Sequence, residues 1–349
     1  MRVLQSGAEH GTLREKKHER SGGKDMSEVL LYAGRAVLPL LLLMGLGCFL
    51  RRCAPWDDGF YRQLNSFCFH VLLPVQLALN VYAIEDLSAL NWRLLGFILA
   101  AILVTAGLGM ALAPLFSRER GQRAVIAQAS FRSNQVIMGI PLASALGGQE
   151  ALLFASLATS VCVPVFNVLS VLVLTAYSER KPSWREELRR IFLNPLVLGA
   201  LVGLAAVGLR ALLPVKLEEA LPSVYQVCGD LSRAASTLVL VILGARLRFD
   251  AVKGLWRQIS ATVALRLVVM PLLVLAAVLA LRQPLGLTVH EMPSLVAIFC
   301  SPVAVTSAVM VQEIGGDEQL AQQAVAWSSA LSLFTIFCFA AALRSLGLL

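Results

Sequence analysis

The sequence predicts an all-α polytopic membrane protein: ten transmembrane helices in two inverted five-helix repeats, with broken, crossing helices 4 and 9. Three observations lead to this prediction. Charged residues make up 15% of the chain and hydrophobic residues 57%, with a mean hydropathy of +0.73, whereas soluble domains carry about 25% charged residues. The apolar residues form long runs, and about 20 apolar residues span a bilayer as a helix. A weak internal repeat relates the two halves.

Ten apolar spans follow one another along the chain. They are expected at residues 28–50, 60–83, 91–115, 124–147, 150–177, 191–210, 222–246, 257–281, 293–314 and 320–346. The first five spans form one repeat, 28–177, and the last five form the second, 191–346, with a connecting loop at 178–190. Residues 1–25 are charged and poor in apolar side chains, which predicts a disordered tail. If Met26 is the natural start, this tail is not part of the natural protein.

The distribution of Lys and Arg between the loops predicts the orientation of the chain. The loops after spans 1, 3, 5 and 7 hold 15 basic residues, and the opposite side holds 5. Short cytoplasmic loops are enriched in Lys and Arg. We therefore expect a multi-pass protein of the cell (plasma) membrane, with loop 178–190 in the cytoplasm and both termini on the outer side. The same bias accounts for the net charge of +8, and no nucleic-acid partner is expected.

The internal repeat is clearest in the fourth span of each half. Residues 124–150 align with residues 292–318, with six identities in 27 positions. The identities pair Ala129 with Ala297, Phe131 with Phe299, Ser133 with Ser301, Gly147-Gly148 with Gly315-Gly316, and Glu150 with Glu318. Because each half has an odd number of spans, the second half must insert upside down, as in many secondary transporters.

Spans 4 and 9 also carry residues that disturb helices. Gly139 and Pro141 are expected to break span 4, and Pro302 is expected to break span 9, because proline removes a backbone donor and crowds the preceding turn. Asn134 and Pro302 occupy equivalent positions in the repeat, so the two breaks should face each other near the middle of the bilayer. Inverted-repeat transporters bind substrate at such a place, although Pro and Gly can also merely kink a membrane helix.

Polar side chains beside the two breaks are the candidate ligands of a substrate. The candidate substrate-binding residues are Arg132, Ser133, Asn134, Ser301, Pro302 and Thr306. A cation at Arg132 would attract an anionic substrate; the alternative is a structural ion pair, for example with Glu313. Arg266 lies within span 8, and we expect its long side chain to snorkel to the cytoplasmic face.

Signals of an enzyme or of a metal site are missing from the sequence. It contains no HExxH, GxSxG, P-loop or GxGxxG motif. The seven Cys are scattered without CxxC spacing. We therefore expect neither catalysis nor a cofactor, and no metal.

The segment Ser133-Asn-Gln-Val-Ile-Met-Gly-Ile-Pro-Leu142 resembles the Pro-Asn-x-x-x-Met-Gly-Ile-Pro-Leu stretch in the fourth helix of the auxin efflux carrier family. Weaker similarities extend over about residues 28–346. They include Asn194-Pro195, Leu243-Gly244, Arg266 with Pro271, and the run from Ser301-Pro302 to Gly315-Gly316-Asp317. The short loop 178–190 is similar to the bacterial malate/malonate-permease-like branch rather than to plant auxin exporters. Ser133 departs from the family proline, which implies a softer break in helix 4.

The resemblance implies a scaffold of helices 1, 2, 6 and 7, which forms a homodimer, and a transport part of helices 3–5 and 8–10 that moves against it. It implies that Asn134 contacts a substrate carboxylate. We therefore expect a secondary transporter for a small organic anion, a mono- or dicarboxylate, with H⁺ or Na⁺ coupling left open. The alternatives are a sodium-coupled bile-acid-type symporter with the same crossover plan, or a membrane-embedded enzyme or sensory domain.

Overall fold

The computed structural model describes residues 38–83, 92–178, 189, 193–213, 216–247, 252–287 and 291–349. The predicted tail, 1–25, and most of the predicted loop, 178–190, lie outside the described residues. Every regular element within the described ranges is a helix, and the only β-structure there is one isolated antiparallel bridge between Ser133 and Val303. This composition suits a bilayer, where each backbone polar group of a spanning segment must find a partner within the protein.

The described helices follow the chain from a first helix at residues 38–53 to a last helix near the C-terminus. The subsequent elements are α2 (Asp58–Phe67), η1 (Cys68–Leu72), α3 (Leu73–Tyr82), α4 (Trp92–Phe116), α5 (Arg120–Phe131), η2 (Gln135–Gly139), α6 (Ile140–Ala176), α8 (Pro195–Leu212), α9 (Leu217–Ala220), α10 (Pro222–Arg246), α11 (Val252–Ala264), η4 (Leu265–Val269), α12 (Met270–Leu285), α13 (Met292–Phe299), α14 (Thr306–Ile314) and α15 (Glu318–Ser345).

Seven helical runs of the described residues are long and apolar enough to cross a membrane. They are Asp58–Tyr82, Trp92–Phe116, Gln135–Ala176, Pro195–Leu212, Pro222–Arg246, Val252–Gln283 and Glu318–Ser345. The described part of the chain thus has the runs of a multi-pass membrane protein, but not ten uninterrupted ones. The difference has local causes. Span 28–50 is described only from residue 38, spans 4 and 9 are interrupted, and the second half of span 4 continues into span 5.

The turn between the second half of span 4 and span 5 lies at Gly148. Its backbone has φ 67° and ψ −151°, a conformation inside the α6 run that is not helical. Residues with a Cβ avoid this region, and glycine adopts it without steric cost. Gly315 and Gly316, the repeat partners of Gly147 and Gly148, also have positive φ, at 128° and 138°, after α14. The C-terminal end of each of the two aligned segments therefore turns at a glycine.

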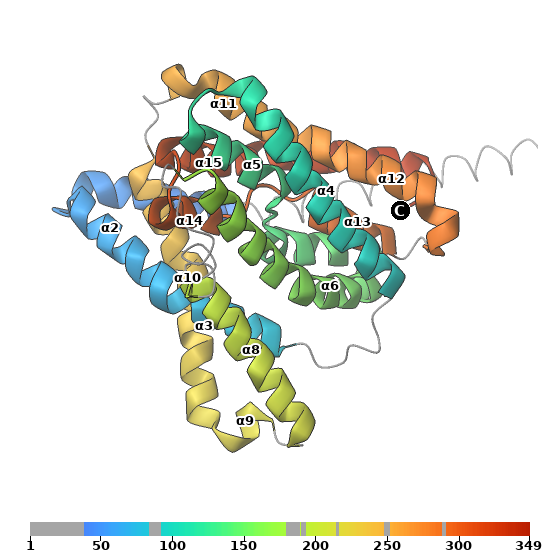
Figure 1. Ribbon diagram of the computed structural model, residues 1–349, viewed down its shortest axis with the longest axis horizontal. Helices are drawn as coiled ribbons and strands as arrows, with labels where there is room; N and C mark the ends of the chain where they lie inside the picture. Colours follow the sequence, from blue (N-terminus) through green and yellow to red (C-terminus); the bar gives the residue numbers. More distant parts are fainter. Residues whose placement is uncertain are drawn as a thin grey trace, which may run out of the picture.

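The helices form two groups (Figure 1). Helix 38–53, α2, α3, α8 and α10 pack together, and we call residues 38–82 and 195–246 the small bundle. Its helices approach very closely: a Cβ on Gly47 would overlap the backbone of Val241, and one on Gly244 would overlap that of Met44. Small residues at such contacts are typical of helix packing in membranes, where close backbone approach replaces the hydrophobic driving force.

The remaining described helices form the large bundle, residues 92–176 and 252–345, in which α4, α5, α6 and α11–α15 pack on one another. Figure 1 shows α11 and α12 on the far side of this group from α8, α9 and α10. The two bundles meet where α3 and α8 contact α6, and where α2 and α10 contact α14. A site between the bundles is therefore built from residues distant in the sequence.

Three described helical runs contain a five-residue π-helical turn, and each turn ends two residues before a proline. η1 precedes Pro74, η2 precedes Pro141 and η4 precedes Pro271. The ring of a proline crowds the carbonyl four residues earlier and its nitrogen offers no hydrogen. In each turn the residue before the proline instead donates to the carbonyl five residues back. The widened turn lets the helix continue through the proline.

This geometry corrects the predicted position of the break in span 4. Gly139 and Pro141 lie inside the continuous helical run of η2 and α6, and the interruption lies earlier, at residues 132–134. The π-turn of η2 carries the helix through Pro141. Gly139 has a packing role, because its Cα faces the backbone of Ala297 in α13.

Candidate functional site

Two helical runs of the large bundle are interrupted near their middle. The chain is non-helical at residues 132–134, between α5 and η2, and at residues 300–305, between α13 and α14. We call these two stretches together the crossover. The interruption of span 9 includes Pro302, as the sequence predicted, and the interruption of span 4 includes Asn134.

The two stretches of the crossover are joined through their backbones. The amide of Asn134 donates to the carbonyl of Pro302 at 2.9 Å, and the amide of Ala304 donates to the carbonyl of Arg132 at 3.2 Å. This is the hydrogen-bond exchange of an antiparallel β-bridge. It satisfies backbone groups that leave their helices within a low-dielectric interior. The interruptions at Asn134 and Pro302 therefore lie against each other.

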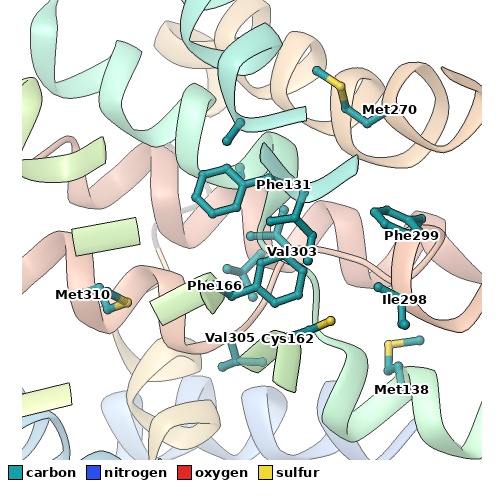
Figure 2. Close-up of a cluster of buried hydrophobic side chains, with 14 of the residues drawn as sticks. Phe131, Met138, Cys162, Phe166, Met270, Ile298, Phe299, Val303, Val305 and Met310 are labelled. Carbon is teal, nitrogen blue, oxygen red and sulfur yellow. The ribbon is translucent and has the colours of Figure 1, made fainter. Parts of the chain in front are cut away.

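Apolar side chains surround the crossover. Figure 2 shows Phe131, Phe166 and Val303 next to one another, with Cys162 and Ile298 close by. The rings of Phe131 and Phe166 stack with centroids 6.2 Å apart. This packing excludes water from the backbone of the crossover and strengthens the polar contacts within it.

The guanidinium of Arg132 lies at the crossover and is only 4% exposed. Nη1 donates to the carbonyl of Phe166 at 3.1 Å and to the hydroxyl of Ser170 at 2.8 Å. Nη2 donates to Oδ1 of Asn167 and to the hydroxyl of Thr306, both at 2.8 Å. All four acceptors are neutral, so they hold the guanidinium in place but leave its charge uncompensated.

Glu313 is not the partner of Arg132. Its carboxylate accepts from Nδ2 of Asn65 at 3.3 Å and from the hydroxyl of Ser66 at 3.4 Å, both in α2. The structural ion pair that the sequence offered as an alternative for Arg132 is therefore wrong. Within the described residues, no carboxylate lies within ion-pair distance of this guanidinium. A buried cation without a counter-ion favours the approach of an anion.

A cavity opens beside the crossover, between the two bundles. It measures about 80 Å³ as space open to the centres of water-sized molecules. The large bundle contributes four of the predicted site residues to its wall: Arg132, Ser133, Asn134 and Thr306. The small bundle contributes polar and apolar side chains, among them Leu73, Gln76, Leu77, Asn80, Leu196, Ser236 and Val239.

Several buried polar atoms at the crossover have no hydrogen-bond partner within the described protein. They are Nε of Arg132, Oγ of Ser133, Nδ2 of Asn134, both amide atoms of Gln135, and Oγ of Ser307. Leaving a buried polar group unpaired costs about 1–3 kcal/mol, and such groups are few in folded proteins. All but the Ser307 hydroxyl belong to residues 132–135, so this stretch of the crossover has spare donors and acceptors for a ligand.

Ser301 and Pro302 are placed differently from the other predicted site residues. Neither lines the cavity. The hydroxyl of Ser301 donates to the carbonyl of Ala297 at 2.5 Å, and the carbonyl of Pro302 accepts the amide of Asn134. These residues hold the crossover together from behind the cavity. Sequence spacing alone could not show on which side of the interruption each group points.

The expectation that Arg266 snorkels to the cytoplasmic face is wrong. Its side chain is 1% exposed and points inward from η4 to the crossover. It donates to the carbonyls of Ser130, Phe131, Ile298 and Ser301. The carbonyl oxygens around the guanidinium supply the hydrogen-bond acceptors that a snorkelling side chain would find in water.

Sequence reasoning missed other residues of the site. Gln135 directly follows the first interruption and Ser307 lies two residues after the second, and their side chains are unpartnered within the described protein. Asn167 holds Arg132, and Gln76 and Asn80 line the cavity from α3. Each of these is a polar residue within an apolar span. The four-residue spacing of Gln76 and Asn80 on one helical face was a usable signal.

Comparison with known proteins identifies the family of the chain. A family model described as membrane transport protein, Mem_trans, matches residues 32–340. The match includes both stretches of the crossover and all helices of both bundles except the last residues of α15. No curated protein matches the chain. The chain belongs to the Mem_trans family, the auxin efflux carrier family of secondary membrane transporters.

Proposed function

We propose that this transporter carries a small organic anion, a mono- or dicarboxylate, which binds at the crossover. One observation supports this most strongly. The uncompensated guanidinium of Arg132 lies beside the unpartnered Nδ2 of Asn134 and hydroxyl of Ser133, and all three residues line one cavity. Two donors and a cation in the wall of one cavity complement a carboxylate, which only accepts hydrogen bonds.

The direction of the half-helices adds to this preference. The run of η2 and α6 begins at the crossover, and so does α14. Helix N-termini carry partial positive charge and point unsatisfied N–H groups outward. In transporters with broken helices, such ends face the anionic group of the substrate. Val305, the residue before α14, lines the cavity.

The layout that we propose for the whole chain is ten spans in two inverted repeats. Support comes from the antiparallel backbone bonds at the crossover and from the glycine turns at Gly148 and at 315–316. In this layout, three spans are added to the seven long runs. They are helix 38–53 and spans 4 and 9, each of which consists of two half-helices. We further propose a plasma-membrane homodimer that associates through the small bundle, with loop 178–190 in the cytoplasm and both termini outside.

Alternating access would come from movement of the large bundle along the small bundle. The cavity lies between them: Asn134 and Thr306 belong to the large bundle, and Gln76 and Asn80 to the small one. A substrate held by the large bundle would exchange one set of neighbours on the small bundle for another as it moves. Coupling of this movement to H⁺ or Na⁺ is considered below.

The experiment that tests the proposed site is transport by Asn134→Ala in proteoliposomes, against a panel of labelled mono- and dicarboxylates. Loss of a hydrogen bond to a charged group costs about 1.5–3 kcal/mol, so we expect uptake at low substrate concentration to fall about tenfold or more. The matched control is Gln283→Ala, which removes an exposed amide at the end of α12 and should transport normally. Unchanged transport by Asn134→Ala would reject the site.

A further inference from the structure

The guanidinium of Arg266 occupies a place built from backbone oxygens. Its closest contacts are with the carbonyl of Ser301, at 2.9 Å from Nε and 2.7 Å from Nη2. Nη1 lies 3.2 Å from the carbonyl of Phe131 and 3.4 Å from that of Ser130. Nη2 also lies 3.4 Å from the carbonyl of Ile298. Two separate helix ends therefore share one side chain.

These oxygens converge because α5 and α13 both end at the crossover. The last carbonyls of a helix lack intrahelical partners and carry partial negative charge. Ser130 and Phe131 are the last residues of α5, and Ile298 and Ser301 lie at the end of α13 and just beyond it. Two helix C-termini that face each other within a membrane favour a cation between them. In inverted-repeat transporters, half-helix C-terminal ends and unwound carbonyls coordinate the coupling Na⁺ or H⁺.

We propose that Arg266 is a tethered cation that fills the cation site of the crossover, so that this carrier needs no free Na⁺ there. The inference rests on the proposed function for its consequence in transport. Its structural basis is independent of any substrate: one buried guanidinium satisfies oxygens from two helix ends. Na⁺ also prefers oxygen ligands, as hard cations do.

The two buried arginines of the crossover have different positions and different roles. Arg132 lines the cavity and has one donor, Nε, without a partner. Arg266 does not line the cavity, and all of its guanidinium nitrogens have partners. Arg132 is thus free to interact with an anion, whereas Arg266 neutralises the helix ends behind it. A coupling cation would compete with Arg266 for the same oxygens.

Removing the Arg266 side chain should turn the tethered site into an open one. In Arg266→Ala, the carbonyls of Ser130, Phe131, Ile298 and Ser301 would lose their shared donor, and a small free cation could replace it. The purified chain can report this without a known substrate, because a cation that binds only the folded state raises the melting temperature. The probes are Na⁺ and low-millimolar guanidinium, each compared with choline at constant ionic strength.

We expect the wild-type melting temperature to be the same in NaCl and in choline chloride. We expect Arg266→Ala to melt several degrees lower in choline chloride and to regain part of this loss in Na⁺ or in guanidinium. The matched control is Arg257→Ala in α11, an exposed arginine that donates to the carbonyl of Leu115 and lies outside the crossover. It should show no cation dependence.

Two further arms keep the proposal falsifiable if Arg266→Ala does not fold. Arg266→Lys keeps a tethered cation and should remain insensitive to Na⁺. Stabilisation of the wild type or of Arg266→Lys by Na⁺ over choline would overturn the proposal, and so would a folded Arg266→Ala that neither cation stabilises. None of these measurements involves a carboxylate. An error in the proposed substrate would therefore appear only in the transport assay. An error in the role of Arg266 would appear only in these melting temperatures.

Discussion

At the scale of single residues, Gly139 illustrates a packing requirement that resembles a helix break in the sequence. A Cβ at this position would lie 2.6 Å from the carbonyl oxygen of Ala297 in α13. Overpacking of this kind costs about 1–3 kcal/mol, so Gly139→Ala should lower the melting temperature and weaken transport. The control is Gly107→Ala in α4, where no atom lies within 4 Å of the added Cβ; helix propensity predicts about 0.5–1 kcal/mol of stabilisation there. Equal melting temperatures for the two variants would contradict the prediction.

Among individual residues, the sequence was informative where a polar or charged side chain falls within an apolar span. Arg132 and Asn134 were identifiable because a charge and an amide within an apolar span have few other uses. Ser301 and Arg266 were not, because the spacing of residues does not reveal the direction in which a side chain leaves an irregular backbone. The carbonyl cluster that holds Arg266 involves α5 and the end of α13, two helices that are far apart in the sequence. The order of residues along the sequence therefore does not predict this carbonyl cluster.

At the scale of elements, the packing of helix 38–53 on α10 depends on two glycines. Cβ atoms on Gly47 or Gly244 would overlap the backbone of the opposite helix, and Sγ of Cys48 lies 3.0 Å from the carbonyl of Gly244. Gly244→Val should therefore separate these helices, with a lower melting temperature and a smaller monodisperse fraction in size-exclusion chromatography. Gly208→Val in α8, where the added Cβ meets no atom within 4 Å, is the control. A normal elution profile for Gly244→Val would show that the close contact is dispensable.

Helix positions could be predicted well from apolar runs, since the bilayer fixes their length. The division of span 4 was misplaced for a physical reason. A proline in a membrane helix need not end it: the π-turn of η2 carries the helix through Pro141. The actual interruption at 132–134 contains neither Gly nor Pro, because tertiary hydrogen bonds with residues 302 and 304 stabilise the extended backbone there.

At the scale of the whole molecule, polar contacts bridge the two bundles on the side of α14 and α15. Nη2 of Arg246 in α10 donates to the carboxylate of Glu318 at 2.5 Å, and Asn65 and Ser66 of α2 contact Glu313. Any sliding of the bundles must break these contacts. Partly exposed ion pairs contribute about 0.2–1 kcal/mol, so Glu318→Gln should raise the turnover rate by up to about fivefold in a proteoliposome assay.

The control for this prediction is Asp58→Asn. Asp58 pairs with Arg51 at 2.9 Å, but both residues belong to the small bundle, so sliding leaves their contact unchanged. A similar change in both variants would indicate a general effect of surface charge, and an unchanged rate for Glu318→Gln would show that the bridge does not limit movement.

The two guanidinium groups at the crossover have a consequence for the response of the carrier to membrane voltage. The described residues offer neither of them a carboxylate partner, so the proposed movement of the large bundle would carry positive charge through the electric field. One elementary charge that traverses 100 mV changes the free energy by about 2.3 kcal/mol. An inside-negative potential would draw the unloaded bundle toward the cytoplasm. A bound monovalent anion cancels part of that pull, so the loaded and empty carriers should respond to voltage to different degrees.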